Sequence, residues 1–247
     1  MSKEAIIKTQ NLTKSFGAFT AVDKISFEAM PGEIFGFLGA NGAGKTTAMK
    51  MLSGLLKPSS GTASVVGFDV FKQSEMIKKN IGYMSQKFSL YDDLTVEENI
   101  AFFGGIYGLR GDVLKLAQME LLERLQLMDQ SKKLVASLPL GWKQKLSFSV
   151  AMIHKPRLVF LDEPTGGVDP ITRRQFWEMI YEAAENGVTI FVTTHYMDEA
   201  EYCSRVSIMV DGKIAAMDTP RALKEQFGAK NMDEVFYTLA RGAKRGE

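Results

Sequence analysis

Residues 39–46 read G-A-N-G-A-G-K-T, with two glycines, a lysine and a hydroxyl residue at the spacing of a phosphate-binding loop. A glycine-rich turn that feeds a helix N-terminus presents a concave row of N–H groups to an anion. Lys45 adds a positive charge for the β- and γ-phosphates, and the Thr46 hydroxyl is the expected Mg²⁺ ligand. The candidate nucleotide-binding residues of the loop are Gly39, Ala40, Asn41, Gly42, Ala43, Gly44, Lys45, Thr46 and Thr47.

The segments on either side of the loop agree with this interpretation. Residues 33–38 (E-I-F-G-F-L) are typical of a short buried strand, and residues 46–55 are typical of a helix. The alternative is a glycine-rich turn that arose by chance. The strand-loop-helix setting favours the phosphate loop, so the sequence predicts a nucleotide-binding protein.

The amino-acid composition limits the classes of protein to which this chain can belong. The 247 residues are 45% hydrophobic and 24% charged, which is enough for one large domain or two small lobes. A formal net charge of +1 does not favour a nucleic acid partner. Cys203 is the only cysteine, which fits a reducing compartment and a small buried side chain. Because no eighteen apolar residues run together, we expect a soluble, cytoplasmic chain whose membrane role depends on partners.

Strand-like and helical patterns alternate along the chain. Three short β-rich runs, broken by glycine and proline, predict an antiparallel sheet beside the loop: 4–9, 25–30 and 62–66. From about residue 94 to 154 the pattern is helical, and Thr95 with Glu98 forms a candidate capping box.

Strand signals return in the last third of the chain. They lie at 158–161, 188–193 and 205–210, separated by helical stretches, and such alternation predicts a parallel sheet in an α/β fold. Asp211-Gly212 predicts a hairpin turn, and Pro220 is expected to begin a C-terminal helix.

A second group of chemical residues follows the apolar strand at 158–161. Asp162 and Glu163 come at its end, where a parallel sheet presents its ligand crevice. Phosphoryl transfer needs one acid that holds Mg²⁺, directly or through water, and one that orients the attacking water, and we assign Asp162 and Glu163 to these roles. The alternative is an acidic pair that is merely solvated.

Three further side chains lie near strand or helix ends. His195 ends an apolar strand and could reach the γ-phosphate, although one histidine in such a place is often structural. Gln86 follows the strand-like segment I-G-Y-M-S, and its amide could coordinate Mg²⁺ or a water, the alternative being a surface glutamine. His154 is expected to favour the dipole at a helix C-terminus.

The motifs together, from the phosphate loop and Gln86 through L-D-E-P-T and G-V-D-P to T-T-H, resemble the ATP-binding cassette (ABC) ATPases over essentially the whole chain. The resemblance implies a RecA-like P-loop NTPase core, an antiparallel β subdomain and an inserted α-helical subdomain. It also implies ATP and Mg²⁺ as cofactors, with ATP held between two head-to-tail copies. We expect one domain over 1–247, in which 1–86 and 155–247 form the core and 87–154 the helical signature subdomain.

The resemblance also implies roles for individual residues. Phe16 looks like the aromatic ring that stacks on adenine, with ordinary core packing as the alternative. Asp169 looks like an acid that communicates across the dimer, and His195 looks like the histidine that senses the γ-phosphate.

One motif departs from the family pattern. Where the family signature reads L-S-G-G-Q or close to it, this chain has the signature residues Leu138, Pro139, Leu140, Gly141 and Trp142. In the usual design a serine hydroxyl and glycine N–H groups contact the γ-phosphate held by the other subunit. Pro139 has neither a hydroxyl nor an N–H, although Gly141 and a helix start remain. We therefore expect an active but altered ATPase.

The variant signature resembles the ATPases of type-two exporters, including drug and multidrug efflux systems. This predicts a transmembrane permease as partner, a homodimer or a heterodimer, and a peripheral place on the cytoplasmic face of the membrane. Residues 87–91 are expected to contact the permease. A soluble cassette protein without a transporter and a weakly hydrolysing regulatory module remain as alternatives.

Overall fold

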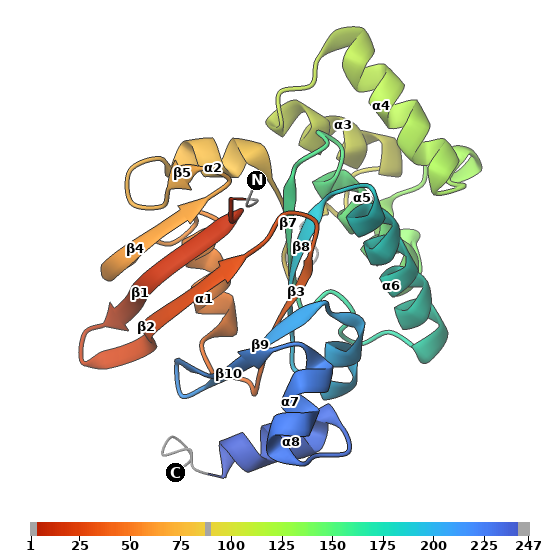
Figure 1. Ribbon diagram of the computed structural model, residues 1–247. Helices are drawn as coiled ribbons and strands as arrows, with labels where there is room; N and C mark the ends of the chain where they lie inside the picture. The colour runs from red at the N-terminus through yellow and green to blue at the C-terminus, as the bar shows by residue number, and fades with distance from the viewer. Residues whose placement is uncertain (1–3, 87–89, 242–247) are drawn as a thin grey trace.

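Two β-sheets lie on either side of a shared hydrophobic core in the computed structural model, which describes residues 4–86 and 90–241 (Figure 1). The helix α1 (Lys45–Leu52) lies between them, and its buried Met49 and Leu52 contribute to that core. The phosphate loop, which leads into α1, therefore lies next to this core.

The larger sheet carries the strands that end at the site. Its six strands follow the order β10-β9-β3-β8-β7-β6, and the central pairs β9/β3, β3/β8, β8/β7 and β7/β6 are parallel. The strands are β3 (Ile34–Gly39), β6 (Ile81–Met84), β7 (Leu158–Asp162), β8 (Thr189–Thr194), β9 (Arg205–Val210) and β10 (Lys213–Asp218). The predicted parallel strands are confirmed.

Both faces of this sheet are covered, which explains the unbroken apolar runs of its strands. Phe35, Phe160 and Phe191 point to the core around α1. Their neighbours Val159 and Ile190 point to the opposite face, where α5 (Leu140–Ala151) and α6 (Pro170–Glu185) pack.

The smaller sheet is antiparallel throughout, as predicted, in the order β2-β1-β4-β5. It contains β1 (Ile7–Phe16), β2 (Phe19–Ala29), β4 (Ser60–Val65) and β5 (Phe68–Asp69). Strand β1 continues well beyond the predicted run at 4–9. Irregular pairing with β2, including Asn11 at φ 50°, breaks the alternation of apolar and polar residues that marks a strand in sequence.

A helical region with its own core projects from the larger sheet (Figure 1). It contains α3 (Val96–Ile106), α4 (Gly111–Arg124), the short 3₁₀ helices η1 (Met128–Gln130) and η2 (Val135–Ser137), and α5. The predicted capping box at the start of α3 is confirmed, because Glu98 N–H donates to the Thr95 hydroxyl and Thr95 N–H donates to the Glu98 carboxylate.

The remaining elements are α2 (Ser74–Asn80), the 3₁₀ helix η3 (Met197–Tyr202), α7 (Pro220–Phe227) and α8 (Met232–Ala240). Asp211 and Gly212 form the turn between β9 and β10, and Pro220 is the first residue of α7, as predicted. Within the described ranges, no helix combines the length and the apolar character needed to cross a membrane.

The expectation for His154 is wrong. Its ring stacks on Tyr107 at a centroid distance of 3.7 Å, and burial lowers its pKa to about 4. A neutral imidazole carries no positive charge for a helix dipole. His154 instead joins the end of α3, where Tyr107 lies, to the segment that leads into β7.

Candidate nucleotide-binding site

The phosphate loop runs from the end of β3 to the start of α1 in a conformation that its glycines make accessible. Gly44, the N-cap of α1, has φ 105°, and a Cβ there would lie 2.5 Å from the carbonyl oxygen of Ala21. A Cβ on Gly39 would lie 2.6 Å from the carbonyl oxygen of Met209. The positive φ of Gly44 and the lack of room for a Cβ beside Ala21 therefore both require glycine at this position.

Lys45 is 4% exposed and folds back onto the loop. Its Nζ donates hydrogen bonds to the carbonyl oxygens of Gly39 at 2.8 Å and Ala40 at 3.1 Å. The same atom lies 3.4 Å from Glu163 Oε1. Burial lowers the pKa of Lys45, and the attraction to Glu163 opposes part of that shift.

Glu163 is the point where the predicted catalytic side chains meet. Its Oε2 accepts a hydrogen bond from Gln86 Nε2 at 2.9 Å and lies 3.0 Å from His195 Nδ1. Its Oε1 faces Lys45. The backbone at Glu163 is left-handed, at φ 48°, and its N–H donates to the carbonyl oxygen of Thr193 at 3.0 Å. Three residues predicted from separate motifs, Lys45, Gln86 and His195, thus converge on one carboxylate.

Asp162 and Thr46 lie side by side next to this carboxylate. Thr46 Oγ1 donates to Asp162 Oδ1 at 3.2 Å, and Thr193 Oγ1 donates to the same oxygen at 2.6 Å. Hydroxyl and carboxylate oxygens are ligands that Mg²⁺ prefers, so the two residues fit the predicted metal. Thr193, which sequence reasoning missed, orients Asp162; its only sequence signal is a hydroxyl in the buried strand before His195.

The rest of the loop surrounds these groups. Ala40, Asn41 and Gly42 are exposed at its tip, Ala43 is buried, and Thr47 is half-buried on the first turn of α1.

Phe16 ends β1 with its side chain 51% exposed. Lys14 Nζ lies over its ring at 5.0 Å from the centroid. Core packing, the alternative role for Phe16, is therefore wrong, and the ring is available for stacking.

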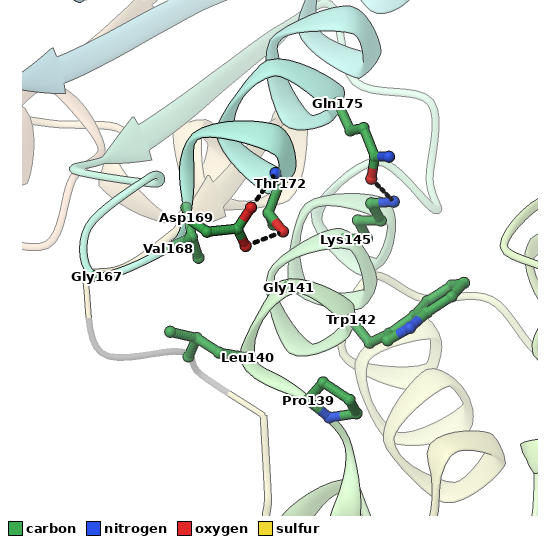
Figure 2. A pocket seen from close by; sticks show the side chains of 10 residues that line it. All are labelled: Pro139, Leu140, Gly141, Trp142, Lys145, Gly167, Val168, Asp169, Thr172 and Gln175. Atoms are coloured by element: carbon green, nitrogen blue, oxygen red, sulfur yellow. Dashed lines mark hydrogen bonds between the residues drawn. The ribbon is translucent and has the colours of Figure 1, made fainter.

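Four residues of the variant signature, Pro139 to Trp142, line a pocket together with residues at the start of α6 (Figure 2). Leu138 is buried, Pro139 is the N-cap of α5 at φ −55°, and Leu140 is 41% exposed. A Cβ on Gly141 would lie 2.6 Å from Cγ2 of Thr172, which packs the start of α5 closely against α6.

Asp169 begins α6 beside the signature. Its carboxylate accepts hydrogen bonds from the N–H groups of Ile171 and Thr172, each at 3.0 Å. Bonds from the Thr172 hydroxyl and from the backbone hold the pKa of Asp169 below its usual range. The signature and Asp169 line a cavity of about 340 Å³ formed by Pro139, Leu140, Gly141, Trp142, Lys145, Gly167, Val168, Asp169, Thr172 and Gln175.

Among the described residues, the lining of this cavity includes no member of the phosphate loop.

The expected permease contact at 87–91 is described only in part, because residues 87–89 lie outside the described ranges. Tyr91 is 46% exposed. Its N–H donates to Asn99 Oδ1 at 2.8 Å, and Asn99 Nδ2 donates to its carbonyl oxygen at 2.9 Å. Helix α3 therefore fixes the backbone at the end of this segment.

Comparison with known proteins agrees with this geometry. The family model described as "ABC transporter" matches residues 22–166. The chain is 49% identical over 223 residues to the "Probable multidrug ABC transporter ATP-binding protein YbhF" of Escherichia coli (strain K12), which covers 90% of this chain and 39% of that protein. It therefore spans well under half of the length of that relative.

In two further matches the alignment covers most of this chain and most of the matched protein. The "Linearmycin resistance ATP-binding protein LnrL" of Bacillus subtilis (strain 168) is 37% identical over 93% of this chain and 74% of that protein. A solved structure described as "Structure of ATP binding subunit of ABC transporter" superposes with a TM-score of 0.84 and 27% identity, over 95% of this chain and 99% of that one. From its sequence, its fold and the arrangement around the phosphate loop, this chain belongs to the ABC transporter family.

Proposed function

We propose that this chain is the ATP-hydrolysing subunit of an ABC transporter, and that the transporter is an exporter. The observation that carries the proposal is the meeting of Lys45, Gln86 and His195 on the carboxylate of Glu163. Each of these side chains has a role in phosphate chemistry, and unrelated side chains from three separate segments would not share one carboxylate.

Each residue around Glu163 then has a distinct task. Glu163 orients the attacking water and accepts its proton. Lys45 exchanges its bonds to the loop carbonyls for bonds to the β- and γ-phosphates, and His195 contacts the γ-phosphate. Phe16 stacks on the adenine.

The proposed Mg²⁺ ligands are Thr46, Asp162 and Gln86. When bound, Mg²⁺ neutralises charge on the phosphate oxygens. Asp162 is already oriented for this task by the Thr193 hydroxyl.

A second chain completes the site with its signature, as either a homodimer or a heterodimer. Pro139 offers that site no hydroxyl, but α5 begins at Leu140, and the first N–H groups of a helix attract an anion. Loss of one hydrogen bond to a charged oxygen costs about 1.5–3 kcal/mol, which slows turnover without abolishing it.

The proposed direction of transport follows from the relatives, whose names include a multidrug transporter protein and a linearmycin resistance protein. The proposed partner is a transmembrane permease that holds this chain at the cytoplasmic face of the membrane. The docking segment is proposed to include Leu90 and Tyr91.

Steady-state hydrolysis of Mg-ATP by the wild type, Glu163→Gln and Lys45→Ala tests the catalytic proposal, with the oligomeric state measured by light scattering. We expect the wild type to turn over, Glu163→Gln to lose roughly 100-fold or more in kcat and accumulate as an ATP-bound dimer, and Lys45→Ala to lose ATP binding. A wild type that hydrolyses no more ATP than Lys45→Ala, alone and in native membranes, would refute the proposal.

Photo-crosslinking in native membranes tests the partner. A crosslinker at Tyr91 should capture a membrane protein, whereas one at Lys57, an exposed residue beside Lys14 of β1, should not. Capture of soluble proteins alone from Tyr91 would contradict the docking proposal.

A further inference from the structure

A fully buried carboxylate lies one turn beyond the proposed catalytic histidine. Glu199, on η3, is 0% exposed, as is Thr165, whose hydroxyl donates to Glu199 Oε1 at 2.5 Å. Thr165 is two residues beyond Glu163 in the chain. The loop that carries Glu163 is therefore attached, through one hydroxyl, to the segment that carries His195.

Arg173 adds a third segment to the same carboxylate. Its Nε lies 3.7 Å from Glu199 Oε1, and its guanidinium packs over the Tyr196 ring at 4.4 Å from the centroid. The rings of Tyr196 and His195 are 4.2 Å apart. Arg173 thus contacts both the buried acid and the neighbour of the proposed γ-phosphate sensor.

The position of Arg173 also links this group to the signature. It lies in the first turn of α6, where its N–H donates to the carbonyl oxygen of Asp169 at 3.0 Å. Thr172, the preceding residue, is the one that contacts the start of α5 at Gly141. A displacement of the signature helix would therefore reach Arg173 through one packed side chain.

Stability alone is a weak explanation for this arrangement. Among the described residues, neither Arg173 Nε nor Glu199 Oε2 has a hydrogen-bond partner, although both atoms are buried. Buried ion pairs are often no more stabilising than apolar side chains of similar volume, and incompletely paired ones are less so. Polar groups that break the rules of core packing are typical of functional sites.

We propose that Glu199 is a positioning residue for ATP hydrolysis, because it holds Thr165 close to Glu163 and Arg173 against the ring next to His195. The proposal rests on the hydrolytic function proposed above. Glu199 touches no reacting atom. It sets the distance between the loop of the general base and the segment of the γ-phosphate sensor.

Matched variants separate positioning from packing. Glu199→Gln keeps the shape and an acceptor for Thr165 but removes the charge that faces Arg173. Thr165→Val keeps the shape and removes the hydroxyl, whereas Thr165→Ser keeps the hydroxyl. Glu201→Gln is the control, since Glu201 lies on the same 3₁₀ helix but pairs with Lys224 at the surface.

We measure kcat and KM for Mg-ATP, with ATP affinity and thermal unfolding of each variant. Glu199→Gln and Thr165→Val should lower kcat about tenfold or more and change KM less than about threefold. Thr165→Ser and Glu201→Gln should remain within about threefold of the wild-type kcat. The double variant of Glu199→Gln and Thr165→Val should lose less kcat than the product of the two single losses, because both substitutions alter contacts of the same side chain, Glu199.

Wild-type kcat in folded Glu199→Gln and Thr165→Val, even with a lower Tm, would overturn the inference. Should Glu199→Gln fail to fold, Thr165→Val against Thr165→Ser carries the test. A wild type without hydrolysis refutes the proposed function, whereas an active wild type with equally active variants refutes only the positioning role.

Discussion

Gly44 and Gly42 both have positive φ, at 105° and 81°, but their surroundings differ. A Cβ on Gly44 would meet a backbone oxygen at 2.5 Å, whereas a Cβ on Gly42 would meet nothing within 4 Å. We predict that Gly42→Ala costs about 1 kcal/mol of unfolding free energy, for the torsion alone, and that Gly44→Ala costs about 2–4 kcal/mol. Urea denaturation without nucleotide measures both values. Equal losses would show that the loop relaxes away from Ala21.

Lys45 should make the stability of the nucleotide-free chain depend on alkaline pH. Burial lowers its pKa from the ordinary value of 10.5, so over the interval below 10.5 the unfolded chain binds a proton that the folded chain does not. The free energy of unfolding of the wild type, measured relative to Lys45→Met, should therefore rise as the pH is raised toward 10.5. Denaturation of both proteins at several pH values tests this, and a constant or falling difference would contradict it.

At the scale of elements, the stacked rings of His154 and Tyr107 join the end of α3 to the segment that leads into β7. The free energy of unfolding should depend on this contact as the pH falls. The folded pKa of His154 is about 4, against an ordinary value of 6.5, so the unfolded chain binds the proton first as the pH falls. The wild type should lose about 2 kcal/mol more than His154→Phe between about pH 7 and pH 5.

Phenylalanine keeps the stacked ring and removes the titration, so it is the matched control for this contact. Equal pH dependence of the two proteins would mean that the imidazole becomes protonated without unfolding.

The elements were predictable where the chain repeats a simple pattern. The apolar runs of β7, β8 and β9, the cap of α3 and the turn before β10 were all predicted, because each depends on neighbouring residues. The extension of β1 was not, since its irregular pairing is decided by β2 and β4. Helix α8 was not predicted as a separate helix. Gly228 ends α7, and Asn231 caps the start of α8.

The residues of the candidate site could be predicted from the sequence, but the contacts between them could not. Local motifs identified Lys45, Asp162 and Glu163, but the Thr193 hydroxyl on Asp162 joins residues 31 positions apart. The same holds for Thr165 and Glu199, which are 34 positions apart. Such pairs depend on the order of strands in the sheet, which no local spacing specifies.

At the scale of the whole molecule, the phosphate loop and the exposed Phe16 belong to one packed body, because α1 and β1 share a core. ATP that contacts both should stabilise the entire fold. At a concentration 100 times its Kd, a ligand adds about 2.7 kcal/mol. We predict a rise in Tm with Mg-ATP for the wild type and little rise for Lys45→Ala, measured by calorimetry, and equal rises would contradict binding at the loop.

The bonds that Lys45 makes to its own loop have a consequence for selectivity. Its ammonium group already has two carbonyl oxygens and a carboxylate as neighbours, so an arriving anion must displace these neighbours. A small monovalent ion such as chloride makes too few contacts to compensate for the loss of these neighbours. A polyphosphate replaces all of them and also accepts hydrogen bonds from the loop N–H groups. We therefore expect that the loop does not bind the monovalent anions of its surroundings and binds nucleotide in preference to them.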